Sequence, residues 1–150
     1  MSDYLYFDKK IAPTTDLIFF KRNIQESLKE IEKYLPDSYD KAEFPMDIIP
    51  ILRKMNIMGG IHKKYGCPGL STKEFIIVLL EISKIDLSLA TFMGVQVSLV
   101  IETIYNLGSE YQKSHYIPKL CNLDLIGGFA LTEPKHGSDS ILMETTCEVY

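Results

Sequence analysis

The stretch DLSLATFMGVQVSLVIETIYNLG, residues 86–108, decides the fold, because its apolar side chains leave almost no polar face on a helix. Asp86 or Ser88 can accept hydrogen bonds from the first amides of this helix, and Gly108 ends the pattern. A helix that is apolar on all sides is buried among other elements of a globular protein. We therefore predict that these residues form the centre of a helical bundle.

Two amphipathic patterns precede this central helix. Apolar residues recur at steps of three or four over residues 17–35, and Pro36 is expected to close that helix. A second helical pattern spans residues 45–57, with Gly59 and Gly60 as its expected stop. Both helices are predicted to pack their apolar sides on the core.

Two capping boxes mark further helix starts. Ser71 with Glu74, and Ser109 with Gln112, place a hydroxyl and a longer polar side chain three residues apart, so that each satisfies an unpaired amide. The first box predicts a helix that runs to about residue 84. The second predicts a short helix that ends at the corner 117–120.

Composition and charge indicate a packed globular protein. At 150 residues the chain is long enough for one domain, and its 46% apolar and 24% charged residues are near the averages for globular proteins. The net charge of -4 and the scattered basic residues exclude a nucleic-acid footprint. The uncharged apolar run 87–101 is short for a bilayer crossing, so no membrane segment is expected.

The sequence pattern changes near residue 125. Residues 125–131 are typical of a strand, residues 132–139 of a turn, and residues 145–150 of extended backbone. An isolated strand leaves its amides and carbonyls unpaired, so its partners are expected from another chain or from a longer gene product. The predicted fold class is mainly α: a helical domain over residues 1–124, followed by the first strands of a truncated middle β domain over residues 125–150.

The most informative motif is FALTEPKHGSD, residues 129–139. Its strand would deliver Thr132 to an exposed end, and its Gly137-Ser138-Asp139 turn would present free amides. Such amides and hydroxyls can bind a phosphate or the polar edge of a ring. Taken alone, however, a turn of this composition most often only reverses the chain.

Together these eleven residues resemble the signature of acyl-CoA dehydrogenases: small, aliphatic, Thr or Ser, Glu, two variable places, a small residue, then Gly, Ser and Asp. His136 departs from this pattern, because the family usually has a small residue there. The resemblance extends from about Phe44 to the end, through YGCPGLS (65–71), EISKID (81–86), GSEYQK (108–113) and MET (143–145). The branch it resembles most comprises glutaryl-CoA dehydrogenases and plant peroxisomal short-chain acyl-CoA oxidases.

The resemblance implies FAD as cofactor and an acyl-CoA thioester as substrate. It also implies an all-helical N-terminal domain and a middle β domain, with a second helical bundle to follow. The cofactor-binding candidates it implies are Phe129, Ala130, Leu131, Thr132, Glu133, Pro134, Lys135, His136, Gly137 and Ser138. Ser138 and Thr91 are its substrate-site candidates, and either an electron-transfer protein or oxygen would accept the electrons.

The same resemblance bears on substrate and catalysis. Glutaryl-CoA enzymes carry an arginine where this chain has Ala90, so we expect a short-chain acyl-CoA without a distal carboxylate. The family's catalytic base is a glutamate beyond residue 150, so no catalytic residue is assigned, and Glu133 resembles the structural glutamate of the turn. The alternatives to an oxidoreductase are a truncated, non-catalytic helical module or an incomplete gene model.

The remaining reactive residues predict no further site. Cys67, Cys121 and Cys147 are odd in number and widely spaced, which suits neither a disulfide framework nor a zinc site. His62 and His115 are expected on exposed faces, without metal ligands around them.

The sequence gives less information on the cellular compartment and the oligomeric state. Residues 1–6 show no targeting segment, and cysteine usage suits a soluble reducing compartment. The family resemblance allows the cytoplasm or a mitochondrial or peroxisomal matrix. It also allows a homo-oligomer if the protein is full length.

Overall fold

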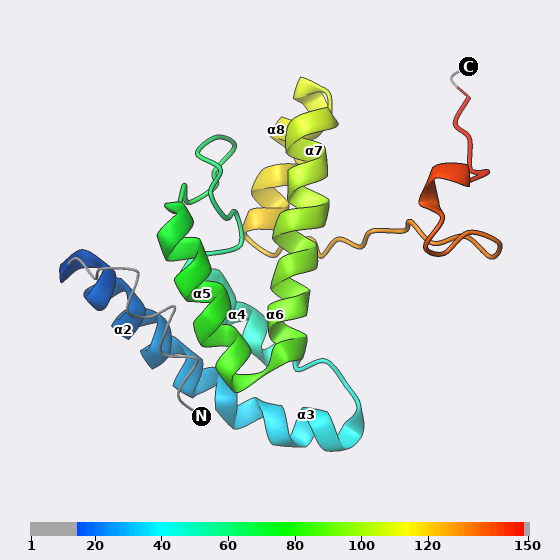
Figure 1. Cartoon of the computed structure of the whole chain (residues 1–150). Coiled ribbons are helices and arrows are strands. Elements are labelled where there is room, and N and C mark those ends of the chain that lie inside the picture. The colour runs from blue at the N-terminus through cyan, green and yellow to red at the C-terminus, as the bar shows by residue number, and fades with distance from the viewer. Residues whose placement is uncertain (1–14, 149–150) are drawn as a thin grey trace.

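The structure, a computed structural model, describes residues 15–148 (Figure 1). Residues 1–6, where no targeting segment is expected, lie outside the described residues, as do the last two residues of the predicted extended segment 145–150. The helices, in chain order, are α2 (Thr15–Ile31), the 3-10 turn η1 (Glu32–Tyr34), α3 (Leu35–Lys41), the 3-10 turn η2 (Met46–Ile48), α4 (Ile49–Met55), α5 (Thr72–Ile85), α6 (Leu87–Gly94), the π-helical η3 (Val95–Ile101), α7 (Glu102–Leu107), α8 (Glu110–Cys121) and the 3-10 turn η4 (Ser140–Leu142).

The apolar stretch that opens the sequence analysis forms one continuous rod, because α6, η3 and α7 follow each other without a break (Figure 1). Its first turn is capped by Asp86, whose carboxylate accepts a hydrogen bond of 2.8 Å from the amide of Leu89. By length and composition alone, Leu87–Leu107 could cross a membrane, a test that core helices of soluble proteins also pass. Here it packs against the other helices of the domain.

The rod is not buried on all sides, so that part of the sequence prediction is wrong. Leu87 and Leu107, at its two ends, are 70% and 82% exposed, and Leu99 in its middle is 41% exposed. The reason is that the described helices α5 and α8 cover the rod only in part. Periodicity shows that a helix is apolar, but it does not show which part of the protein covers each side.

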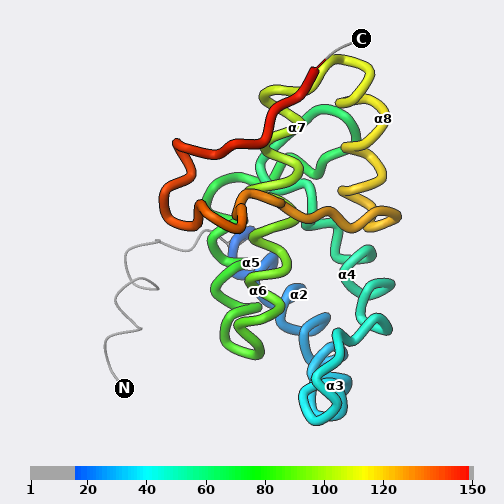
Figure 2. Tube along the Cα trace, turned by 90° about the vertical axis from the view of Figure 1, so that its right-hand side faces the viewer, coloured from blue at the N-terminus to red at the C-terminus, as the bar shows by residue number. Residues whose placement is uncertain are grey.

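Two hydrophobic clusters meet along the rod. α2 packs on α5 and α5 on α6, whereas α8 packs on α7 and η3; both views place α3 at the end of the molecule opposite to α7 and α8 (Figures 1 and 2). The larger cluster is built from α2, α4, α5 and the first half of the rod. The smaller cluster consists of Val100, Ile101, Ile117, Leu120 and Cys121.

Glu81 is a buried carboxylate that joins α2 to α5. Its side chain accepts hydrogen bonds from Gln25 at 2.8 Å and Lys84 at 2.7 Å, and Lys21 lies 3.5 Å away. Burial raises the pKa of the Glu81 carboxyl, but these donors and cations outweigh it, so the pKa is lowered overall. The charge is therefore retained inside the helix pair.

Both capping boxes are confirmed. The hydroxyl of Ser71 accepts a hydrogen bond from the amide of Glu74 at 3.2 Å, and the Glu74 carboxylate accepts one from the amide of Ser71 at 2.7 Å. Ser109 and Gln112 make the equivalent pair at 3.2 and 2.8 Å. The sequence therefore predicts the starts of α5 and α8 correctly, because the cap uses only neighbouring residues.

Helix ends differ from the predictions at three places. Pro36 does not stop the helical path but lies in the first turn of α3, where a missing amide costs nothing. The second helix ends at Asn56, whose φ of 51° closes it before Gly59. α8 continues through Pro118 to Cys121, because burial of its last turn in the smaller cluster offsets the lost hydrogen bond.

Residues 126–148 contain no strand within the described part of the chain, and η4 is their only helical turn. The backbone that the sequence predicts as strand, 125–131, therefore has no ladder here, because a strand exists only with a partner to pair with. The mainly helical fold is confirmed. The division into domains at residues 124 and 125 stays a prediction.

The capping box of α5 can be tested with a matched pair of substitutions. Ser71→Ala removes the acceptor for the Glu74 amide and should lower the free energy of unfolding by about 1 kcal/mol. Ser83→Ala, in the same helix, removes only a hydroxyl bonded to the Leu79 carbonyl and should be neutral or slightly stabilising. Urea denaturation of both variants measures the difference; equal effects would contradict the cap's role.

Candidate functional site

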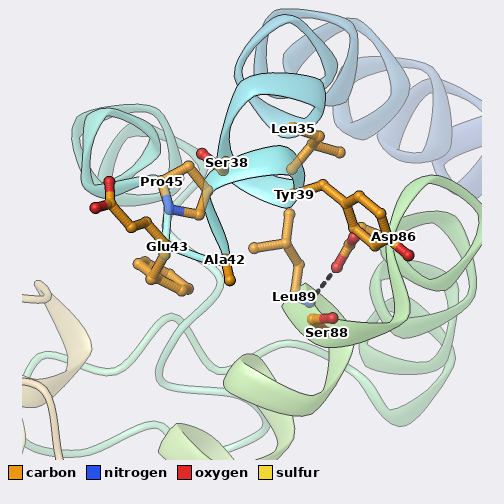
Figure 3. A pocket seen from close by; sticks show the side chains of 10 residues that line it. Leu35, Ser38, Tyr39, Ala42, Glu43, Pro45, Asp86, Ser88 and Leu89 are labelled. Atoms are coloured by element: carbon orange, nitrogen blue, oxygen red, sulfur yellow. Dashed lines mark hydrogen bonds between the residues drawn. The ribbon is translucent and has the colours of Figure 1, made fainter.

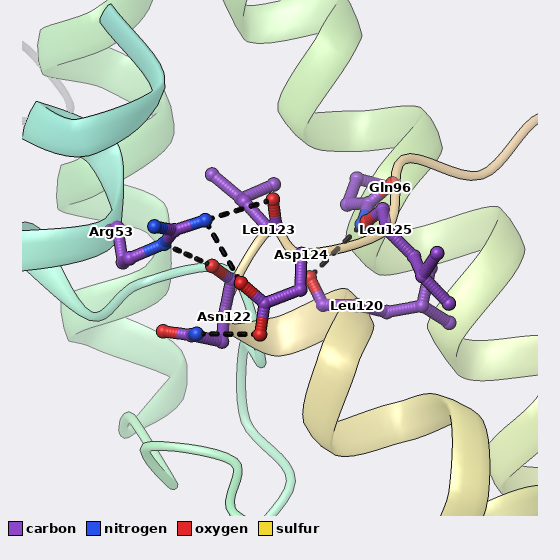
Figure 4. Close-up of polar contacts among 7 residues, drawn as sticks. All are labelled: Arg53, Gln96, Leu120, Asn122, Leu123, Asp124 and Leu125. Carbon is purple, nitrogen blue, oxygen red and sulfur yellow. Dashed lines mark hydrogen bonds and ion pairs between the residues drawn. The ribbon is translucent and has the colours of Figure 1, made fainter.

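The chain leaves the helical domain through a contact with Gln96, a residue of η3 with 1% of its surface exposed. Its amide nitrogen donates to the carbonyls of Leu120 at 3.0 Å and Leu125 at 3.1 Å (Figure 4). Its carbonyl oxygen accepts from the amide of Gly127 at 2.9 Å. One buried side chain thus fixes the last turn of α8 and the first residues of the exit segment, defined as residues 125–127.

Arg53 fixes the turn just before the exit segment. Its Nε donates to the carbonyl of Asn122 at 2.7 Å, and its Nη2 lies 3.0 Å from a carboxylate oxygen of Asp124 (Figure 4). Leu123, between these two residues, is buried with a φ of 55°. The guanidinium therefore holds a sharp turn after α8 and joins it to α4.

Gly127 passes against the rod without room for a side chain. A Cβ atom built on it would lie 2.4 Å from Cγ1 of Val100, whereas one built on Gly128 would meet nothing within 4 Å. The backbone therefore crosses η3 in direct contact at Gly127 and leaves the domain at Gly128. Figure 1 shows the following residues running outward from the bundle.

The predicted cofactor segment, residues 129–138, begins two residues beyond this contact and is exposed at most positions. Phe129 and Leu131 are 45% and 40% exposed. The main-chain groups and the hydroxyl of Thr132 make no hydrogen bond with another described residue, and the same holds for Phe129 and Leu131. Phe129, Leu131 and Thr132 thus present neutral donors and acceptors that have no partner in residues 15–148.

Glu133 organises the turn that follows Thr132. Its amide and carbonyl pair with those of His136 at 2.9 and 3.1 Å, which closes the turn. Its carboxylate accepts hydrogen bonds from the amides of Glu144 at 2.7 Å and Thr145 at 2.8 Å, and from the Thr145 hydroxyl. Each hydrogen bond of this carboxylate is made to residue 144 or 145, in line with the expectation that Glu133 shapes the turn.

The other polar residues of the segment are used in different ways. Lys135 and His136 lie 3.7 and 3.9 Å from carboxylate oxygens of Glu144, so both flank the bridge that Glu133 makes. Gly137 and Ser138 are exposed, and a Cβ on Gly137 would meet nothing within 4 Å. The backbone of this turn is therefore open to a ligand.

Thr91, the predicted substrate contact on α6, is not brought to this segment. Its hydroxyl donates to the carbonyl of Leu87 at 2.9 Å, and the side chain is exposed. No hydrogen bond or ion pair among residues 15–148 joins it to residues 129–138. In the structure the Thr91 hydroxyl is hydrogen-bonded within its own helix. A contact between Thr91 and the substrate stays a prediction.

A groove lies elsewhere, between α3 and the start of α6, and none of the predicted site residues lines it. Leu35, Ala42, Pro45 and Leu89 supply its apolar wall, and the Asp86 carboxylate at its edge is occupied by the cap of α6 (Figure 3). No group of three or more His, Cys, Asp or Glu side chains among the described residues could hold a metal ion. The groove therefore offers no reactive constellation.

The sequence prediction for His62 is wrong, and the structure adds a contact between two cysteines that the sequence does not predict. His62 is not on an exposed face, because its ring stacks on Tyr105 at 3.8 Å and its Nε2 lies 2.6 Å from a carboxylate oxygen of Glu102. Cys67 and Cys121 are free cysteines whose sulfur atoms lie 3.1 Å apart. Spacing along the chain could not reveal either contact, because both depend on how the loop after α4 packs on the rod and α8.

Comparison with known proteins identifies the family of the helical part of the chain. The family model described as the N-terminal domain of acyl-CoA dehydrogenase matches residues 19–124. An acyl-CoA dehydrogenase from Bacillus subtilis (strain 168) is 37% identical over 135 residues, which is 89% of this chain and 36% of the relative. An NADH-dependent acryloyl-CoA reductase from Anaerotignum propionicum is 33% identical over 118 residues, covering 78% of this chain and 30% of the relative.

Solved structures of related enzymes show the same fold over most of this chain. A glutaryl-CoA dehydrogenase from Mycobacterium smegmatis in complex with FADH2 superposes with a TM-score of 0.77 at 28% identity, over 93% of this chain and 36% of that one. A butyryl-CoA dehydrogenase from Megasphaera elsdenii has a TM-score of 0.71 at 25% identity, over 85% and 35%. The chain belongs to the acyl-CoA dehydrogenase family. It spans about a third of the length of these relatives.

The contact of the exit segment with the rod can be tested by adding one methyl group at each of two adjacent glycines. Gly127→Ala forces a Cβ into Val100 and should lower the free energy of unfolding by roughly 1–3 kcal/mol. Gly128→Ala is the matched control and should change stability little, because its Cβ points into open space. If the two variants unfold alike in urea, the exit segment does not cross the rod as described.

The Glu133 turn should depend on pH. Hydrogen bonds from the Thr145 hydroxyl and from the amides of Glu144 and Thr145 lower the pKa of this carboxyl below the ordinary 4.5. Because the folded pKa is depressed, the bonds are present at neutral pH and are lost as pH falls through that lowered value. NMR titration should therefore show Glu133 titrating below 4.5, together with loss of amide protection at Glu144 and Thr145 as the carboxylate is protonated.

Glu133→Gln provides the control for this titration, because it keeps an acceptor of the same shape without the charge. In this variant the two amides should be less protected at neutral pH, and their protection should no longer change with acid. A Glu133 carboxyl that titrates at or above 4.5 in the unaltered chain would contradict the structural role given to it.

Proposed function

We propose that this chain is the N-terminal part of a longer FAD-dependent enzyme that oxidises a short-chain acyl-CoA thioester between its α and β carbons. Family membership and the dehydrogenases among the relatives support this reaction class. The chain spans about a third of their length, so the reaction is assigned to the longer polypeptide. The base that removes the α proton is expected from the remaining part of that polypeptide.

One observation supports the proposal most directly: the main-chain groups of Phe129, Leu131 and Thr132 and the Thr132 hydroxyl project from the helices without partners among residues 15–148. Exposed backbone groups of this kind are solvated by water when the segment is free, and they are available to pair with another strand or with a ligand. The Gln96 contact fixes where this segment starts. A flavin ring, with donors and acceptors along one edge, is a ligand that suits such groups.

The residues present fit FAD by the chemistry of their donors. We assign the main chain of Phe129 and Leu131 and the hydroxyl of Thr132 to the isoalloxazine ring, and Gly137 and Ser138 to the pyrophosphate and the acyl-CoA. When bound, FAD supplies the acceptor for the hydride that leaves the β carbon. Neutral donors suit this position, because their hydrogen bonds can strengthen as the reduced ring gains negative charge.

The substrate is proposed from what the rod lacks. Ala90 is half-buried on α6, at the place where the sequence resemblance puts the arginine of glutaryl-CoA enzymes. A distal carboxylate of the substrate, buried there without a cation, would weaken binding by about 3–5 kcal/mol. We therefore assign a monocarboxylic, short-chain acyl group.

An electron-transfer protein is the proposed acceptor of the electrons, with oxygen as the alternative. A homo-oligomer is proposed for the full-length protein.

FAD retention separates an enzyme segment from a helical module. We expect the 150-residue chain to retain no flavin after gel filtration, because most flavin contacts would come from the rest of the polypeptide. The polypeptide that continues from this chain should retain one FAD per chain. Stoichiometric flavin on the 150-residue chain, or none on the longer one, would contradict the assignment.

Thr132→Val in the flavin-containing longer polypeptide tests the proposed ring contact. Loss of one hydrogen bond should weaken FAD binding roughly three- to tenfold, with a shifted flavin absorption band. Thr146→Val is the matched control, because Thr146 is also exposed but lies outside the motif. If both variants bind FAD equally well and keep the same spectrum, Thr132 does not contact the flavin.

The same polypeptide tests the substrate class. Butyryl-CoA should bleach the flavin absorption under anaerobic conditions, and glutaryl-CoA should not. Peroxide formation in air would identify oxygen as the acceptor. Bleaching by glutaryl-CoA at an equal rate would overturn the assignment made from Ala90.

A further inference from the structure

Cys67 and Cys121 lie at a junction that the proposed reaction does not use. Cys67 belongs to the loop between α4 and α5, and Cys121 is the last residue of α8. Their sulfur atoms are 3.1 Å apart, about 1 Å more than the ~2.05 Å of a disulfide bond. Two thiols 54 residues apart in sequence are thus held almost at bonding distance by the packing of the domain.

The loop that carries Cys67 is held in place by its backbone. The amide of Leu70 donates to the carbonyl of Gly60 at 3.0 Å, and the amide of Cys67 to that of Lys64 at 3.2 Å. Gly59 packs beneath it, since an added Cβ would lie 2.7 Å from the Cβ of Cys67. The thiol pair is therefore set by packing on both sides, and only a small shift separates it from a covalent link.

The two thiols differ in exposure and acidity. Cys121 is buried in the smaller cluster, at 7% exposed, whereas Cys67 is half-buried. A hydrogen bond between the two sulfurs lowers the pKa of Cys67 and raises the pKa of Cys121. A small oxidant would therefore reach the more acidic sulfur first, and the buried thiol stands next to it as the second reactant.

We propose that Cys67 and Cys121 are a redox modification site that closes to an intramolecular disulfide on exposure to a peroxide and reopens with a thiol reductant. The Cys67 thiolate attacks a peroxide oxygen, which breaks the O–O bond, releases hydroxide and leaves Cys67 as a sulfenic acid. The Cys121 thiol then attacks that sulfur, and its proton leaves with the displaced hydroxyl as water. In sum, two thiols and one hydrogen peroxide give one disulfide and two waters.

The link would act on the end of α8. Cys121 precedes the turn that Arg53 holds and lies four residues before Leu125, whose carbonyl is bonded to Gln96. A disulfide would link the loop between α4 and α5 to the end of α8, just before the exit segment. In the unfolded chain it would tie together two residues 54 positions apart, which lowers the conformational entropy of that state. Oxidation should thus stiffen the part of the domain from which residues 129–138 project.

The test uses the 150-residue chain with Cys147→Ser, because Cys147 is exposed and could link two molecules. The reduced protein is treated with hydrogen peroxide, unfolded, alkylated with N-ethylmaleimide and digested for mass spectrometry. We expect a Cys67–Cys121 peptide pair that has lost two hydrogen atoms and is recovered as two alkylated peptides after dithiothreitol. The oxidised chain should melt about 5 °C or more above the reduced one.

Single-cysteine variants provide the control. Cys67→Ser, and Cys121→Ala as a packing-tolerant alternative to Cys121→Ser, should abolish both the linked peptide and the peroxide-induced rise in melting temperature. Two outcomes would overturn the proposal: Cys67 converted to sulfinic acid without a linked partner, or both thiols still alkylated in full after peroxide treatment. Linkage without any rise in melting temperature would contradict the stiffening of the domain.

Discussion

The buried amide of Gln96 is the interaction on which the exit from the helical domain depends. Gln96 lies in the π-helical part of the rod, at the boundary between the two hydrophobic clusters, and its side chain makes three hydrogen bonds there. A buried amide left unpaired costs about 1–3 kcal/mol, so full pairing favours a single path for the chain. That path sends residues 129–138 outward from a fixed point on the rod, beside a turn that Arg53 holds and close to the thiols of Cys67 and Cys121.

This constraint connects the fold to the proposed chemistry. The helices provide a rigid support, and the segment that extends from it carries main-chain and hydroxyl groups at Phe129, Leu131 and Thr132 without partners among residues 15–148, whereas the Glu133 carboxylate is hydrogen-bonded within the turn. The proposed role of these groups is to contact the flavin, and the base is proposed to come from the rest of the longer polypeptide. The partly uncovered rod, with Leu87, Leu99 and Leu107 exposed, is consistent with a domain that acts within a longer polypeptide.

The sequence predicts the local features well and the long-range ones poorly. Capping boxes at Ser71 and Ser109 are right because each depends on residues three positions apart. The strand expected over 125–131 is absent from the described residues, because pairing requires a partner strand. The contacts of His62 with Glu102 and of Cys67 with Cys121 could not be predicted from the sequence. The first joins residues 40 positions apart and the second joins residues 54 positions apart. The motif at 129–138 indicates a family and a cofactor, but its contacts with that cofactor stay predictions.

Amide hydrogen exchange at the exit segment tests the central claim most directly. The amide of Gly127 is bonded to Gln96, whereas Gly128 and Phe129 make no hydrogen bond within residues 15–148. NMR-detected exchange on the 150-residue chain should show Gly127 exchanging much more slowly than Gly128 and Phe129, and Gln96→Leu should remove that difference in a chain that is still folded. Equal exchange at the three amides of the unaltered chain would show that Gln96 does not hold the path of the segment.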